Sequence, residues 1–181
     1  MGRVYEGIDD RLAAWLSAQH VFFVATAPVA RDGHVNISPK GGRDTLVVLD
    51  PNRVAYLDLT GSGAETIAHL RENGRITIMC CAFDGPPRIV RLYGRGSVLL
   101  RGSAAFSQLI DRFSADDGTR SIIAVELDRI ADSCGYNVPR LTFDADRDNL
   151  HHWTAQRSAA ELERYRAEKN AVSIDGLPAL P

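Results

Sequence analysis

The sequence predicts a mainly β protein, built as an antiparallel β-barrel with peripheral helices. Three observations predict this fold: the apolar stretches are short and often alternate, turns rather than helices join most of them, and only two short helical segments interrupt their run. At least six such strands in about 110 residues favour closure into a barrel, because closure removes exposed edges. The missing crossover helices argue against a parallel doubly wound sheet.

The elements follow from periodicity and turn chemistry. The predicted strands are His20 to Ala27, His34 to Ser38, Thr45 to Asp50, Arg53 to Leu59, Arg75 to Phe83, Arg88 to Leu100 and Ser121 to Leu127. The predicted helices are Asp9 to Gln19, Ala64 to Glu72, Ser103 to Phe113 and Ala155 to Lys169, followed by an extended tail from Ser173 to Pro181. Pro39 to Gly42 is expected to end the second strand, and Gly74 to end the second helix.

Composition excludes several classes of function. The chain has 181 residues, 21 Lys and Arg against 23 Asp and Glu, and a net charge of −2, so no broad positive field attracts nucleic acid or an anionic membrane. No run of 18 apolar residues or signal-peptide pattern is present. The three cysteines, Cys80, Cys81 and Cys134, form no CxxC pair. We therefore expect a reduced, cytoplasmic protein without a metal site.

The segment from Tyr56 to Thr66 is the most informative part of the chain. It reads as a strand, then the glycine loop Thr60-Gly61-Ser62-Gly63, then a helix start. Free amides at such a helix start, together with hydroxyl groups, can hold a phosphate. The alternative is a simple capped helix, because Ser62 and Glu65 have the spacing of a capping box and Glu65 would repel a phosphate.

A phosphate in this loop needs cations from elsewhere in the chain. The candidates are Lys40, Arg43, Arg75 and Arg88. Strand alternation from Arg88 to Gly96 also places Ile89, Arg91, Tyr93 and Arg95 on one face, which favours either an anionic ligand, a partner subunit or a solvated face with cross-strand salt bridges.

Weaker candidates lie near the C-terminus. The pair His151-His152 stands beside Asp146 and Asp148, a combination that is more typical of a surface than of a metal site. Trp153 lies in a polar region and is interpreted as a cover for a ring or an interface.

Four segments in this order resemble the pyridoxamine 5′-phosphate oxidase-like flavin-binding split-barrel family. They are Asn36 to Gly41, Tyr56 to Thr66, Glu72 to Arg75 and Val90 to Arg95. The later Ser133 to Pro139 resembles a signature of one uncharacterised branch of that family. The resemblance covers about residues 10 to 140. It departs from the true oxidase at Ala64-Glu65-Thr66, where the oxidase has a Ser-Arg-Lys cluster.

The resemblance implies a six-stranded antiparallel split barrel in a homodimer, with flavin mononucleotide (FMN) near the interface. Residues 1–140 would form the flavin-binding domain, and residues 141–181 a C-terminal helix and tail packed on the barrel or on the partner subunit. The implied cofactor-binding residues are Asn36, Ser38, Pro39, Lys40, Gly41, Thr60, Gly61, Ser62, Gly63, Thr66 and Arg75. Within this set, Ser38, Pro39 and Gly41 would hydrogen-bond the flavin ring, and Lys40 would face either the phosphate or the ring.

These implications predict an FMN-dependent oxidoreductase acting on an unidentified small molecule. The flavin would carry out hydride transfer, which agrees with the lack of any nucleophile motif in the sequence. A deazaflavin-dependent reductase is the alternative within the fold. A flavin carrier or a haem-binding protein without enzymatic activity is the alternative from another class.

Overall fold

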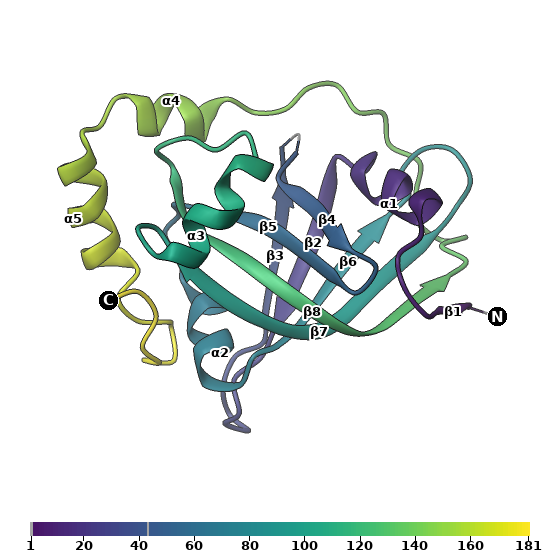
Figure 1. Ribbon diagram of the computed structural model, residues 1–181, viewed down its shortest axis with the longest axis horizontal. Coiled ribbons are helices and arrows are strands. Elements are labelled where there is room, and N and C mark those ends of the chain that lie inside the picture. The colour runs from purple at the N-terminus through teal and green to yellow at the C-terminus, as the bar shows by residue number, and fades with distance from the viewer. Residues whose placement is uncertain (1, 43) are drawn as a thin grey trace.

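A computed structural model describes residues 2–42 and 44–181. It contains one antiparallel sheet in the order β3-β2-β6-β7-β8-β5-β4, with β1 paired to β8 (Figure 1). The strands are β1 (Val4–Tyr5), β2 (Val21–Thr26), β3 (Asn36–Gly41), β4 (Leu46–Asp50), β5 (Arg53–Leu59), β6 (Arg75–Cys81), β7 (Ile89–Leu100) and β8 (Thr119–Ser133). The helices are α1 (Asp10–Ser17), α2 (Glu65–Asn73), α3 (Ala104–Leu109), α4 (Asn149–Ala155) and α5 (Ala159–Lys169), and a 3₁₀ turn spans Ile110–Arg112.

The sheet confirms the antiparallel, mainly β prediction and corrects its details. Every pairing is antiparallel, and the strands curl into a half-barrel with helices around it (Figure 1). The sheet has eight strands instead of the six implied by the resemblance. One of the extra strands, β1, is only two residues long and carries no periodic signal. The order ends at β3 and β4, and no pairing of these two strands is recorded for residues 2–42 and 44–181.

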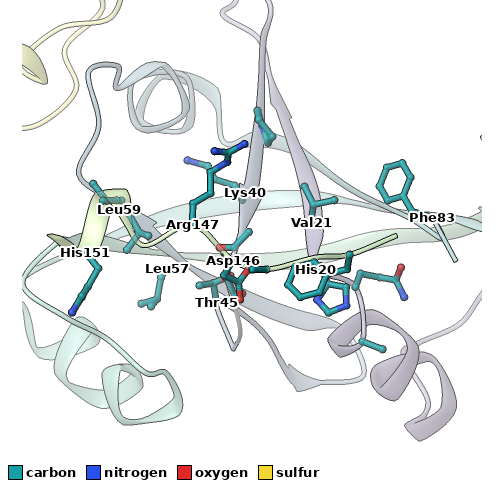
Figure 2. Close-up of a pocket in the computed structure, with 18 of the residues that line it drawn as sticks. His20, Val21, Lys40, Thr45, Leu57, Leu59, Phe83, Asp146, Arg147 and His151 are labelled. Carbon is teal, nitrogen blue, oxygen red and sulfur yellow. Dashed lines mark hydrogen bonds between the residues drawn. The ribbon is translucent and has the colours of Figure 1, made fainter. Parts of the chain in front are cut away.

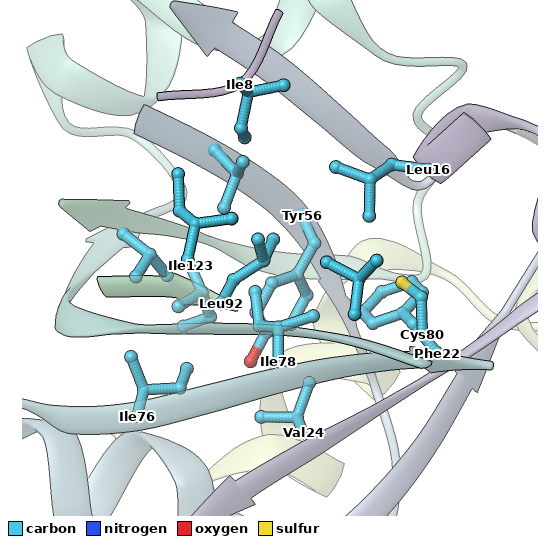
Figure 3. Packing of buried hydrophobic residues seen from close by; sticks show 14 of the residues in the cluster. Ile8, Leu16, Phe22, Val24, Tyr56, Ile76, Ile78, Cys80, Leu92 and Ile123 are labelled. Atoms are coloured by element: carbon cyan, nitrogen blue, oxygen red, sulfur yellow. The ribbon is translucent and has the colours of Figure 1, made fainter. Parts of the chain in front are cut away.

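The core lies inside the curl of the sheet (Figure 3). Tyr56, Ile78, Leu92 and Ile123 are at most 1% exposed there, and the ring of Phe22 meets that of Tyr56 edge-on with centroids 5.6 Å apart. Strand β5 is buried on both faces, because its alternate residues face the main core and a second apolar cluster that includes Phe106 of α3. This double burial explains why β5 reads as a continuous apolar run.

The N-cap of helix α2 is Ala64, two residues after the predicted Ser62. The helix begins at Glu65 without a side-chain cap, so the expected Ser62–Glu65 capping box is wrong. Ser62 lies two residues before the cap and cannot reach the free amides. The predicted stop is confirmed, because Gly74 has φ = 71° and its amide binds the carbonyl of Leu70. The apolar face of α2 packs against Ala179 of the C-terminal tail.

Three other boundaries differ from the prediction. Strand β3 runs through Pro39, which is tolerated because β3 is an edge strand and needs no second ladder. Strand β8 continues to Ser133, since pairing with β7 and β1 holds a polar stretch that has no apolar pattern. The helix predicted from Ala155 to Lys169 ends as predicted but begins at Ala159, where a Ser158–Glu161 capping box starts α5, and the separate helix α4 before it was not predicted.

The remaining predictions concern the cysteines and the membrane. Cys80 and Cys81 are both buried, and burial raises the pKa of Cys80 to about 12, so it behaves as an apolar core residue. Within the described residues, no helix combines the length and apolar character that crossing a membrane requires.

Candidate functional site

Two adjoining cavities lie where β3, β5 and the start of α2 meet. The larger has a volume of about 850 Å³ and the smaller about 240 Å³. Both are lined by Pro39, Lys40 and Leu59, so these three residues form their common wall. The larger volume is typical of a site for a small organic molecule.

The segment after β8 covers one side of the larger cavity. It crosses the molecule from the end of β8 to α4 (Figure 1), and its residues 141–150 contribute Leu141, Phe143 and Arg147 to the lining. The ring of Phe143 stacks on His20 at 3.7 Å between centroids, and the Leu141 amide binds the Phe83 carbonyl at 2.9 Å. Figure 2 shows the side chains of Lys40, Val21 and Leu57 around this space. The cavity therefore has mainly apolar walls with charged groups at a few points.

A buried ionic cluster underlies the smaller cavity. Arg120 is 6% exposed and its Nε lies 2.6 Å from Asp58 Oδ2, while Lys40 Nζ lies 3.6 Å from Asp58 Oδ1. Ser121 donates to the same carboxylate at 3.0 Å. Burial alone would raise the pKa of Asp58, but Arg120 and Lys40 outweigh it and hold that pKa below its ordinary value. Asp58 thus stays ionised and keeps both cations in place.

The C-terminal segment fixes the glycine loop from outside. Asn170 donates to the Gly61 carbonyl at 2.9 Å, and Arg120 donates to the Gly63 carbonyl at 2.9 Å. Arg166 of α5 donates to the hydroxyl of Thr60 at 2.9 Å, and that hydroxyl donates in turn to the Gly118 carbonyl. The loop conformation is therefore set by α5 and β8, which lie far from it in the sequence.

Glu65 contributes a carboxylate to the smaller cavity. Its Oε1 accepts from the Ile174 amide at 3.2 Å, and a Cβ on Gly63 would collide with its Oε2. Gly63 is therefore needed for this placement. The structure brings the acidic side chain to the predicted phosphate cradle, as the spacing of the sequence suggested it would.

A chain of hydrogen bonds leads from the smaller cavity into the protein. The Ser38 hydroxyl donates to Asn36 Oδ1 at 3.0 Å, and Asn36 Nδ2 donates to Thr66 at 3.0 Å and to Thr26 at 3.2 Å. Thr26 Oγ1 lies 2.9 Å from Nδ1 of the buried His69. This network holds Ser38 and Thr66 at the cavity in defined orientations.

The structure brings most of the predicted site residues together. The predicted residues that line the smaller cavity are Ser38, Pro39, Lys40, Gly61, Gly63 and Thr66, and those that line the larger are Pro39, Lys40, Gly41 and Thr60. Asn36 lies behind them in the hydrogen-bond network. Ser62 is exposed and lines neither cavity.

Two of the other predicted cations, Arg75 and Arg88, do not join this cluster. Arg75 follows the far end of α2 and binds the Pro28 carbonyl at 3.2 Å. Arg88 lies against the Trp15 ring, 4.9 Å from its centroid, and 3.6 Å from Asp132. Arg43 lies outside the described residues.

Sequence reasoning missed Asp58, Arg120 and Asn170. A weak signal existed for Asp58 and Arg120, since each is a charged residue inside or beside a stretch that reads as a buried strand. Such a residue is rarely buried unless it has a partner. Asn170 carries no such signal, because it is an ordinary residue at the end of a polar helix.

The weaker candidates have ordinary surroundings. Trp153 meets Tyr165 edge-on with centroids 5.0 Å apart and carries Arg157 over its ring, so it packs within the C-terminal helices. His151 Nδ1 lies 3.1 Å from Asp116 at the larger cavity. No group of three metal-binding side chains is found in the described part of the chain.

Comparison with known proteins identifies the family. The pyridoxamine 5′-phosphate oxidase family model matches residues 8–134. The chain belongs to this family. It is 39% identical to a pyridoxamine 5′-phosphate oxidase family protein, ustO, of Aspergillus flavus, over 97% of this chain and 77% of the relative. The family match confirms the resemblance drawn from the sequence motifs, and the chain is a family member distinct from the true oxidase.

Solved structures support the fold of the family member. HupZ from Group A Streptococcus has a TM-score of 0.52 with 21% identity, covering 68% of this chain and 91% of its own. A FAD-binding protein from Mesorhizobium loti has a TM-score of 0.50 with 14% identity, covering 73% of this chain and 96% of its own. These similarities establish the split-barrel type of fold and its likeness to a flavin-binding protein.

Proposed function

We propose that this protein is a flavin-dependent oxidoreductase and that FMN is its cofactor. The observation that carries the proposal is the pair of adjoining cavities, one roomy and mainly apolar, the other small and polar, with Lys40 lining both. An isoalloxazine ring needs the first kind of space, and a ribityl phosphate needs the second. The family membership and the flavin-binding protein of similar fold support the same proposal.

The residues present fit a flavin in most respects. The first turn of α2 has no side-chain cap, so its free amides are available to a ligand. Arg120, Lys40, Ser38 and Thr66 add donors at the smaller cavity. Of the described residues that line this cavity, Glu65 is the one that opposes a phosphate.

Bound flavin would supply hydride transfer. The chain itself would orient the ring between β3 and the apolar wall of Leu57 and Leu59, and would exclude water there through residues 141–150. Lys40 would place positive charge at the junction, where it stabilises negative charge on the ligand. Asp58 would position Lys40 without touching the ligand.

Exposed apolar residues at the start of β3 and in the connection before it support a homodimer. Val35 and Ile37 are each 67% exposed, and Val29 is 63% exposed. Exposed apolar side chains at and beside the edge strand of a sheet are typical of an interaction surface. We propose that a second copy covers it. Light scattering should then give twice the chain mass of 19.8 kDa.

The function is tested on purified protein. We expect the visible spectrum of added FMN to shift and sharpen on binding at micromolar protein, and a nicotinamide nucleotide to bleach the bound flavin without oxygen. Bound flavin that no such reductant bleaches would favour a carrier, and an unshifted spectrum would contradict the proposal.

A further inference from the structure

We propose that Glu65 determines which flavin the smaller cavity accepts, by cancelling the advantage that a phosphorylated flavin would otherwise have over riboflavin. This inference rests on the proposed function. Its evidence is the set of charges around the smaller cavity, which differs from the basic phosphate site expected of the family.

The carboxylate is held in the cavity from two sides. Its Oε1 accepts from the Ile174 amide at 3.2 Å, and its Oε2 lies against Gly63. Glu65 is also the first residue of α2, where the free amides of an uncapped helix start favour a negative charge. The cavity thus already contains an anion that belongs to the chain.

The cations of the cavity are committed to another partner. Among residues 2–42 and 44–181, the charged residues that line it are Lys40, Glu65 and Arg120. Lys40 and Arg120 both pair with Asp58, at 3.6 Å and 2.6 Å. For Glu65, no ion pair is recorded within residues 2–42 and 44–181. The charges of Lys40, Arg120, Asp58 and Glu65 cancel, so these four side chains together offer a phosphate dianion no net charge attraction.

The same carboxylate suits an uncharged ligand. It can accept hydrogen bonds from the hydroxyl groups of a ribityl chain, which Ser38 and Thr66 can also bind. The free amides and the cations attract a phosphate, but the Glu65 carboxylate repels it at short range. At an intermediate effective dielectric, two such charges a few ångströms apart change binding by at least about tenfold.

The test compares riboflavin and FMN in fluorescence-quenching titrations of three proteins: wild type, Glu65→Gln and Glu6→Gln. Glu6 is exposed on the β1 side of the molecule and lines neither cavity, so its substitution controls for net charge. We expect wild type and Glu6→Gln to bind the two flavins within about threefold of each other. Glu65→Gln should bind FMN at least about tenfold more tightly, with riboflavin affinity almost unchanged, and 0.5 M NaCl should reduce that gain.

Two outcomes overturn the inference in different ways. An FMN-to-riboflavin ratio that is the same in Glu65→Gln and wild type, or a strong FMN preference in wild type, would contradict it while leaving a flavin protein. Binding of neither flavin to any variant would overturn the proposed function as well. Glu65→Lys provides a second variant, and we expect it to exceed Glu65→Gln in FMN affinity.

Discussion

Strands β5 and β8 carry two buried regions of opposite character. Tyr56 pairs with Ile123 inside the apolar core, and two residues further along the same strands Asp58 pairs with Ser121 in the ionic cluster. Both of these residue pairs are completely buried. The apolar region is held by non-directional contacts with many neighbours, whereas the ionic region depends on a few exact partners. Burial alone therefore does not tell how a site responds to substitution.

Loss of Arg120 should have the largest effect. Arg120→Met leaves Asp58 buried with only the more distant Lys40 as a cation, and we expect unfolding to become easier by about 3–5 kcal/mol at pH 7. Urea denaturation measures this change in the free energy of unfolding. The matched control is Arg101→Met, whose guanidinium pairs with Asp117 at the surface and should cost about 1 kcal/mol or less.

Arg120→Met should also change how the free energy of unfolding depends on pH. In wild type, the lowered pKa of Asp58 gives stability that is complete above the unfolded pKa of about 3.9 and is lost as pH falls through the folded value. In Arg120→Met, burial should raise that pKa, so acid restores stability instead. The difference in unfolding free energy between wild type and Arg120→Met should narrow from pH 7 to pH 4. A constant difference would contradict the ionic role given to Asp58 and Arg120.

A deletion in the apolar core should have a smaller and simpler effect. Leu92→Ala removes a fully buried side chain and should destabilise the fold by about 3 kcal/mol at any pH. Flavin affinity of the folded fraction should not change, because Leu92 lines neither cavity. A fall in flavin affinity would show that the two regions are not independent.

His69 of α2 should have the smallest effect. It is buried, its Nε2 has no recorded partner, and burial lowers its pKa. Its contribution to stability is therefore complete above the unfolded pKa of about 6.5 and declines as pH falls below that value. Urea midpoints at pH 7.5 and 5.5 should differ more in wild type than in His69→Gln, and equal differences would exclude His69 as the cause.

The contrast between the apolar core and the ionic cluster also shows which features could be predicted from the sequence. The alternation of β7 and the apolar run of β5 follow from local pattern, and Gly74 marks the end of α2 by its conformation. The glycine loop could be found because it belongs to one local strand, loop and helix start, and Lys40 because it lies in the Asn36 to Gly41 segment of the family resemblance.

The rest depends on contacts between distant segments. The Asp58–Arg120 pair spans 62 positions, and the bond from Asn170 to Gly61 spans 109. No local pattern encodes such a distance, so the ionic cluster and the role of α5 were missed. The Ser62 cap was predicted wrongly because spacing alone cannot fix the exact residue at which a helix begins.

The most direct test of the account is an FMN titration of wild type beside Lys40→Met, followed in the visible spectrum. Lys40 is the cation in the wall that both cavities share. The account predicts one flavin per chain with a shifted spectrum in wild type, and affinity at least about tenfold weaker in Lys40→Met. Equal affinity in the two proteins, or no spectral shift in either, would contradict a flavin that spans the two cavities.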